Sequence, residues 1–152
     1  MSQSDSPATP IPGALLSSPS FQLERLRRRI RDEVEAALNP RETTLREYWV
    51  LSCLVDRDAA SQTALSEMLA IDTSDMVRLI DSLENRGWVR RERDPQDRRR
   101  QIVASTKKGT KAQAELADLV AGAEDRALDE STSKQLKHLR KLAAAIISHE
   151  EN

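Results

Sequence analysis

Arginine and lysine gather in one short stretch of this chain, residues 86–108, where together they could bind a polyanion. Nine of these residues are Lys or Arg and three are acidic, a local charge of +6 in a chain whose formal net charge is −1. Positive charge concentrated on one segment suits the phosphates of duplex DNA. On charge alone, a solvated basic hairpin without a partner stays open as the alternative.

The basic stretch has the pattern of a β-hairpin. Asp94 and Pro95 suit the first and second positions of a type I turn. The β-prone residues 88–89 and 102–103 lie on either side of that turn. The pattern therefore predicts two strands joined by a charged tip. The charged side chains that follow the turn are Asp97, Arg98, Arg99 and Arg100.

Two short helices are predicted immediately before the hairpin. The first spans about residues 62–70 with Ser61 as its N-cap, and the second spans about 73–85 after Asp72. Gly87 suits the left-handed residue that ends a helix. Two short helices joined by a three-residue turn and followed by a basic hairpin form a winged helix-turn-helix. In that motif the second helix enters the major groove of DNA.

Further helices are predicted on both sides of this motif. Apolar side chains recur at spacings of three and four within residues 20–38 and 107–150. Capping boxes start a helix at residues 44–47 and another at residues 132–135. A winged helix is complete near residue 108, so we expect the two helices after the hairpin to pack on each other and on a second subunit. A monomer in which they fold back on the chain is the alternative.

The composition favours one mainly α-helical domain with a small β-hairpin, because only 3% of the residues are aromatic and only four are glycine. Residues 1–13, rich in Ser and Pro, predict a disordered tail. The domain then covers residues 14–152, with the winged helix at about 44–106 and dimerisation helices at about 20–38 and 107–150. The sequence has no apolar run near the roughly 20 residues of a membrane span, and we expect a cytoplasmic protein.

Residue patterns of catalytic, cofactor or metal sites do not occur in the sequence, and we expect neither enzyme activity nor a bound cofactor or metal. Cys53 is the single cysteine, so it can form no internal disulfide. It is either a packed structural thiol or a redox sensor, which needs an exposed thiolate. We favour packing, because no histidine lies near it in the sequence. His138 and His149 are not at a chelating spacing.

The sequence resembles the MarR family of bacterial transcription regulators from about residue 20 onward. The resemblance rests on LSEMLAI from Leu65, DTSDMVRLIDSLENRGWV from Asp72, DPQDRRR from Asp94 and TKKG from Thr106. It implies an obligate dimer, a recognition helix in the major groove and a wing arginine in the minor groove. It also implies control by small phenolic or lipophilic ligands, or by oxidation of a cysteine in some members.

At the matching positions, the resemblance implies that side chains of both the second helix and the hairpin contact DNA. Arg78 matches the position that contacts a base or a phosphate, with a surface salt bridge to Asp75 or Asp81 as the alternative. Asp97 and Arg99 match the wing pair, in which the acid orients the arginine. Asp75 stands where the family often has a small polar residue. The predicted DNA-binding residues are Thr73, Ser74, Asp75, Arg78, Asp97, Arg98, Arg99 and Arg100.

Together these features predict a DNA-binding transcriptional regulator. We expect a homodimeric repressor on a pseudo-palindromic operator, released by a small-molecule or oxidative signal that acts between the dimer helices and the winged domain. The alternative from another class is a winged-helix module that binds a protein partner and no DNA. The three consecutive arginines of the hairpin tip argue against that alternative.

Overall fold

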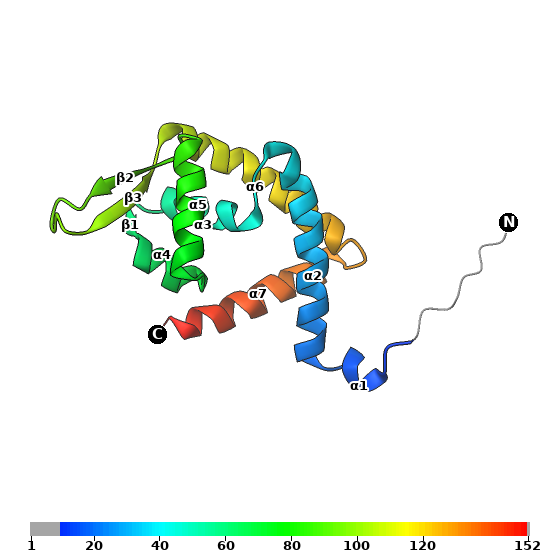
Figure 1. The fold of residues 1–152 in the computed structure, drawn as a ribbon. Helices are drawn as coiled ribbons and strands as arrows, with labels where there is room; N and C mark the ends of the chain where they lie inside the picture. Colours follow the sequence, from blue (N-terminus) through cyan, green and yellow to red (C-terminus); the bar gives the residue numbers. More distant parts are fainter. Residues whose placement is uncertain (1–9, 152) are drawn as a thin grey trace.

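The computed structural model describes residues 10–151, which form a helical body with a small sheet at one side, from which the hairpin projects (Figure 1). Most of the predicted tail, residues 1–9, lies outside the described residues. The elements in order are α1 (Gly13–Leu16), α2 (Pro19–Leu38), the 3-10 helix η1 (Asn39–Arg41), α3 (Leu45–Val55), β1 (Ala60–Ser61), α4 (Gln62–Leu69), α5 (Thr73–Asn85), β2 (Val89–Arg93), β3 (Gln101–Ser105), α6 (Lys107–Ala127) and α7 (Ser133–Glu150). The mainly α-helical class with a β-hairpin is confirmed, and α1 was not predicted.

Capping side chains set the starts of the later helices, as the sequence predicted: α3, α4, α5, α6 and α7. The Thr44 hydroxyl accepts from the Glu47 backbone N–H at 3.2 Å, and the Glu47 carboxylate accepts from the Thr44 N–H at 3.0 Å. Thr132 and Gln135 make the same pair of bonds at the start of α7. The buried Glu47 carboxylate also accepts a 2.7 Å bond from the Ser82 hydroxyl, which joins α3 to α5.

The predicted hairpin is present, but the sheet has three strands, in the order β1-β3-β2. β2 and β3 pair antiparallel with Arg91 opposite Val103, and Ala60 of β1 pairs with the other edge of Val103. The third strand, β1, was not predicted, because it is only two residues long and shows no periodicity that a sequence pattern could reveal. This third strand ties the start of α4 to the base of the hairpin.

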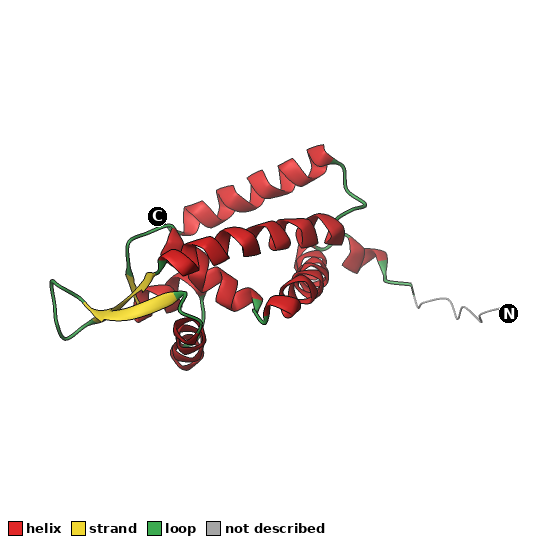
Figure 2. Cartoon of the chain, turned by 90° about the horizontal axis from the view of Figure 1, so that it is seen from above, coloured by secondary structure: helices red, strands yellow, loops and turns green. Residues whose placement is uncertain are grey.

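The hydrophobic core lies where α2, α3, α5 and α6 meet the base of the hairpin (Figure 2). α2 packs along α6, and α3 packs against both α5 and α6. The largest fully buried side chains of the core include Leu38, Leu51, Leu54, Leu65, Met76, Ile80, Leu83 and Leu116. Because α5 contributes three of these, its inner face is fixed and its opposite face is left to solvent.

Helix α7 turns back from α6 and runs along the outside of the molecule (Figures 1 and 2). None of its residues is buried, and Leu142, Ile146 and Ile147 are more than half exposed. The two helices after the hairpin were expected to pack on each other; instead α6 packs along α2, and the apolar stripe of α7 is not buried within one chain. No helix among residues 10–151 is both long and apolar enough to cross a membrane.

Candidate nucleic-acid interface

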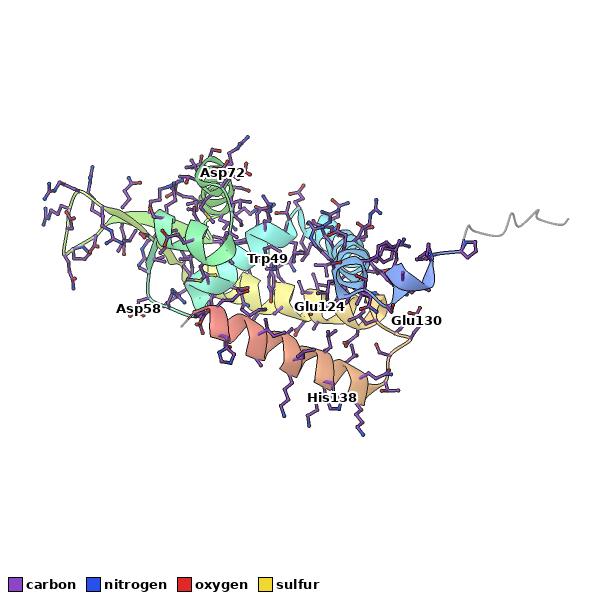
Figure 3. The ribbon with its side chains drawn as sticks, turned by 90° about the horizontal axis from the view of Figure 1, so that it is seen from below. Trp49, Asp58, Asp72, Glu124, Glu130 and His138 are labelled. Atoms are coloured by element: carbon purple, nitrogen blue, oxygen red, sulfur yellow. The ribbon has the colours of Figure 1, made fainter. Side chains whose placement is uncertain are left out.

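Helix α5 presents the predicted contact residues on its solvent face. Asp72 caps the helix, accepting from the backbone N–H of Ser74 at 3.4 Å and from its hydroxyl at 2.9 Å. The hydroxyl bond is the main reason why the pKa of the Asp72 carboxyl lies below its ordinary value. Thr73 and Ser74 follow on the exposed first turn, where the start of a helix suits a phosphate, and the N–H and hydroxyl of Ser74 already bond to Asp72. Figure 3 shows Asp72 and the α7 residue His138 at opposite sides of the molecule.

Arg78 lies one turn into α5, on the same face. Its Nη2 is 3.0 Å from Oδ1 of Asp75, and 73% of its side chain is exposed. The surface salt bridge that the sequence offered as an alternative is therefore formed, while the exposed guanidinium remains accessible to a base edge. Sequence reasoning missed Arg46 of α3, whose Nη1 lies 3.6 Å from Oδ2 of the same Asp75. No pattern in the sequence could have shown that pairing across two helices.

The loop at the hairpin tip, residues 94–100, is built by short-range hydrogen bonds. The Asp94 carboxylate accepts from the Gln96 N–H at 2.9 Å, and the Asp97 carboxylate accepts from the Arg99 N–H at 3.1 Å. Asp97 Oδ1 also lies 3.7 Å from Nε of Arg99, whose side chain is 96% exposed. The acid thus sits beside an arginine that projects freely from the wing, the hairpin formed by β2, β3 and this loop.

Arg98 and Arg100 take part in the same loop mainly through their backbones. The Arg98 carbonyl accepts from the Arg93 guanidinium at 2.9 Å, and the Arg100 carbonyl accepts from the Asp94 N–H at 2.9 Å. Both side chains are exposed. The wing therefore displays three consecutive arginine side chains on a loop whose backbone is held at several points.

Two arginines of the basic stretch 86–108 form interactions within the protein itself. Arg91 pairs with Asp81 at 2.6 Å and with Glu84 at 2.8 Å, and only 18% of its side chain is exposed. The Arg86 guanidinium stacks on the Trp88 ring at 4.8 Å and donates to backbone and side-chain oxygens of the segment before α3. The positive charge available to a partner is therefore smaller than the sequence alone suggested.

A hollow of about 920 Å³ lies between the start of α4 and the wing. Its lining includes Ser61, Gln62, Thr63, Arg93, Arg99, Arg100 and Glu67. Sequence reasoning did not select Gln62 and Thr63 as contacts. The signal that could have found them was Ser61, because an N-cap marks the helix end where free backbone N–H groups suit an anion.

A second cavity, of about 700 Å³, lies between α2, α3 and the α4–α5 connection. This is the region, between a flanking helix and the winged domain, where the sequence analysis expected an effector. Apolar side chains and three arginines share its wall: Ile30, Leu45, Trp49, Leu69, Ile71, Leu79, Arg27, Arg31 and Arg46. One acid, Glu35, also lines the cavity and accepts from the Leu45 N–H. An aromatic or lipophilic body with an anionic group would suit this lining.

Cys53 lies half-buried on α3, with Sγ 3.5 Å from Sδ of Met68. Burial raises the pKa of its thiol above the ordinary value, and the nearby Arg57 only partly opposes that shift. A protonated, packed thiol is a poor nucleophile. No cluster of three metal-ligating side chains occurs in the part of the chain that the structure describes.

Two helices joined by a three-residue turn, a three-stranded sheet and an arginine-rich hairpin define a winged helix-turn-helix protein. The MarR family model matches residues 43–100, the segment that contains these elements. This winged-helix segment is therefore of the MarR type. The transcriptional regulator HosA of Escherichia coli O111:H- is 37% identical over 65 residues, which is 43% of this chain and 48% of HosA. The matched stretch thus spans about half the length of this curated relative.

Solved structures resemble nearly the whole fold. A MarR-family transcriptional regulator from Rhodococcus sp. RHA1 superposes with a TM-score of 0.82 at 27% identity, covering 89% of this chain and 96% of that one. The transcriptional repressor CouR, bound to a 23-mer DNA duplex, gives a TM-score of 0.79 at 27% identity over 93% and 99% of the two chains. CouR from Rhodococcus jostii RHA1 bound to p-coumaroyl-CoA gives 0.76 at 28% identity over 89% and 95%.

Proposed function

We propose that this protein is a DNA-binding transcriptional regulator that contacts the major groove through α5 and the minor groove through its wing. The observation that carries the proposal is that Arg78 and Arg99 project into solvent, 73% and 96% exposed, each beside a carboxylate of its own element. An arginine on a helix face can contact guanine in the major groove. An arginine on a thin hairpin suits a narrow minor groove, whose negative potential is enhanced.

Four other predicted residues are proposed to contact phosphates. Thr73 and Ser74 lie exposed at the positive end of the α5 dipole, while Arg98 and Arg100 flank Arg99 on the wing. The hollow between α4 and the wing gives the DNA backbone a path from one element to the other. CouR, which has a similar fold, was solved on a DNA duplex, and this likeness supports the same use here.

The active form in this proposal is a homodimer. Leu142, Ile146 and Ile147 of α7, and Leu15, Leu16 and Leu23 near the other end of the chain, are exposed apolar side chains. A second copy that covers them would remove this surface from water, by the usual gain of about 25 cal/mol per Å² of apolar area. Two recognition helices would then occupy half-sites about one helical turn, roughly 10 bp, apart on a pseudo-palindrome. Bound at a promoter, the dimer would repress by blocking polymerase.

The cavity between α2 and α3 is the proposed effector site. Trp49 and its aliphatic neighbours suit a small phenolic or lipophilic body, and Arg27, Arg31 and Arg46 suit an anionic group. The p-coumaroyl-CoA bound by CouR combines both features. Because the wall of the cavity includes residues of α2, α3 and α5, a ligand there would change the position of the recognition helix relative to the flanking helix and so release DNA.

Footprinting on the DNA upstream of this protein's own gene tests the proposal, repeated with aromatic carboxylates and with oxidants. We expect a protected pseudo-palindrome and a steep loss of affinity with salt, because each neutralised phosphate releases counterions. A protein that protects no sequence, and whose weak binding to duplex ignores salt, would instead be the winged-helix module that binds only protein partners.

A further inference from the structure

One carboxylate on the exposed face of α5 lies between two arginines from different helices. Oδ1 of Asp75 is 3.0 Å from Nη2 of Arg78, and Oδ2 is 3.6 Å from Nη1 of Arg46 on α3. Each oxygen of Asp75 thus faces a different guanidinium. The two helices are packed together, so Arg46 approaches Asp75 from a fixed neighbour.

Helix stability alone accounts for only part of this arrangement. An acid in the first turn of a helix interacts favourably with the helix dipole, which is reason enough for a carboxylate at this position. That interaction requires neither Arg46 nor Arg78. Both ion pairs are largely solvated, with side-chain exposures of 43% for Asp75 and 54% for Arg46, so they add little to folding stability. The main effect of the two ion pairs is to restrict the positions of the Asp75, Arg78 and Arg46 side chains.

The restriction matters most for the side chain of Arg78. A largely exposed arginine visits many rotamers, and that freedom must be lost when the guanidinium meets a base edge. The bond to Asp75 limits the freedom before DNA arrives. Arg46 in turn occupies the other oxygen of Asp75 and leaves the three side chains with a net charge of +1, which offsets the repulsion between a carboxylate and nearby phosphates.

We propose that Asp75 is a positioning residue that sets the direction of Arg78 for base recognition, and that Arg46 holds Asp75 in place from α3. Asp75 acts through Arg78 and contacts no base itself. The inference rests on the proposed DNA binding and deepens it, because it assigns sequence discrimination to three residues that act together. Arg46 also lines the cavity beside Trp49, so an anion bound there would compete with Asp75 for the same guanidinium.

The test compares affinity with discrimination in the full-length protein. A preferred duplex is selected by the wild type from a random pool, and the base pairs that depend on Arg78 are found with Arg78→Ala. Asp75→Asn should bind a random duplex more tightly, because a negative charge has been removed near phosphates. Its preference for the selected duplex over one changed at those base pairs should nevertheless fall, on the order of 3- to 10-fold. These opposite directions separate positioning from simple repulsion.

Glu67→Gln is the matched control. Glu67 is an exposed acid of α4 that lines the hollow beside the wing, and no arginine pairs with it in the described structure. Removing its charge should strengthen binding to the selected, changed and random duplexes equally. Asp75→Glu, which keeps the carboxylate, should recover part of the lost discrimination. Thermal melting of each variant confirms that α5 is still folded.

Double variants complete the test. Arg46→Gln should reduce discrimination less than Asp75→Asn does, and should add no further loss in the Asp75→Asn protein. In the Arg78→Ala protein, Asp75→Asn should change affinity but not discrimination. If Asp75→Asn behaves like Glu67→Gln, with discrimination unchanged, the inference is wrong while the proposed function stands. If the wild type selects no duplex at all, the proposed function fails and this inference falls with it.

Discussion

Arg91 of β2 lies 2.6 Å from Asp81 of α5, measured from Nη2 to Oδ1, so an ion pair joins the wing to the proposed recognition helix. The same guanidinium pairs with Glu84 at 2.8 Å, and the Arg91 backbone N–H donates to that carboxylate at 3.1 Å. Only 18% of the Arg91 side chain is exposed. Arg91 therefore fixes the position of the wing relative to α5, the two elements that are proposed to enter different grooves.

Replacing Arg91 should loosen that connection. We expect Arg91→Met to lower the free energy of unfolding by about 1–3 kcal/mol, less than for a fully buried pair because Asp81 and Glu84 stay partly solvated. Arg90→Met is the control: it removes the same charge from the same strand, but Arg90 is 57% exposed and, within residues 10–151, its ion pair is with Glu92. That control should change stability by less than about 0.5 kcal/mol. Urea denaturation measures both, and equal losses would contradict the assignment.

Gly109 shows a second constraint on the wing. A Cβ on this residue would lie 2.0 Å from the carbonyl oxygen of Trp88, at the base of the hairpin. Gly109→Ala must therefore separate α6 from the hairpin, and we expect a loss of more than about 2 kcal/mol together with weaker DNA binding. Gly122→Ala, on the same helix, meets only the end of a flexible Arg126 side chain and should stabilise the protein by about 0.5–1 kcal/mol. Thermal unfolding of the two variants should shift in opposite directions.

Local signals in the sequence predicted the local structure well. The caps at Thr44, Ser61 and Thr132 start helices, and Gly87 has the left-handed φ of +74° that the helix end required. Such features depend on residues a few positions apart, so a single sequence contains them. The basic stretch and its hairpin were predicted for the same reason, from turn residues and β-prone neighbours.

Contacts between distant residues could not be predicted in this way. The pairs Arg46–Asp75 and Arg91–Asp81 join different elements, and Trp49 reaches the cavity only because α2 and α3 pack as they do. The charge count therefore treated Arg91 as available to DNA, although it is engaged by acids of α5. Strand β1 was missed because it is defined by its partner β3 and not by its own two residues.

Cys53 gives a prediction about sensing. Because burial raises the pKa of its thiol, little thiolate is present at neutral pH, and Cys53→Ser should keep DNA binding and its response to a natural effector. The measurement is the release of bound DNA by hydrogen peroxide. Met68→Leu serves as the control, because the exposed Met68 sulfur beside Cys53 can be oxidised in its own right. Release that occurs in the wild type and in Met68→Leu, but is lost in Cys53→Ser, would establish Cys53 as the sensor.

The exposed stripe of α7 gives a prediction about assembly. Ile146→Glu places a charge on a side chain that is 56% exposed in one chain, so it should leave the fold of the subunit intact. In a dimer that buries this face, the same charge would be costly, and sedimentation should show a shift to monomer with a large loss of operator affinity. Ala144→Glu adds the same charge about 160° around the helix from both Leu142 and Ile146 and should disturb assembly less. Deleting the residues after Thr132 should abolish the dimer or cause aggregation, and a truncated protein that stays dimeric would refute the role of α7.

The two proposed DNA contacts differ in what they should recognise. Arg78→Ala should cost about 1–3 kcal/mol and relax the base preference at one or two base pairs of each half-site, because the residue projects from a helix held by the core. Arg99→Ala should weaken binding most on A·T-rich flanks, since a wing arginine responds to the width and potential of the minor groove. Asp97→Ala should resemble Arg99→Ala in kind but be milder, because the arginine is still present and has lost only the acid 3.7 Å from its Nε.

Operators with substitutions in the core or in the flanks distinguish these outcomes, when each variant is titrated at one stated salt concentration. Arg98→Ala is the control for the wing: it removes the same charge from the neighbouring exposed position, whose side chain is proposed to meet only phosphates. It should weaken binding to every operator alike and reduce the salt dependence by about one counterion. If Arg99→Ala loses discrimination in the core and ignores the flanks, or behaves like Arg98→Ala, the wing does not enter the minor groove as proposed.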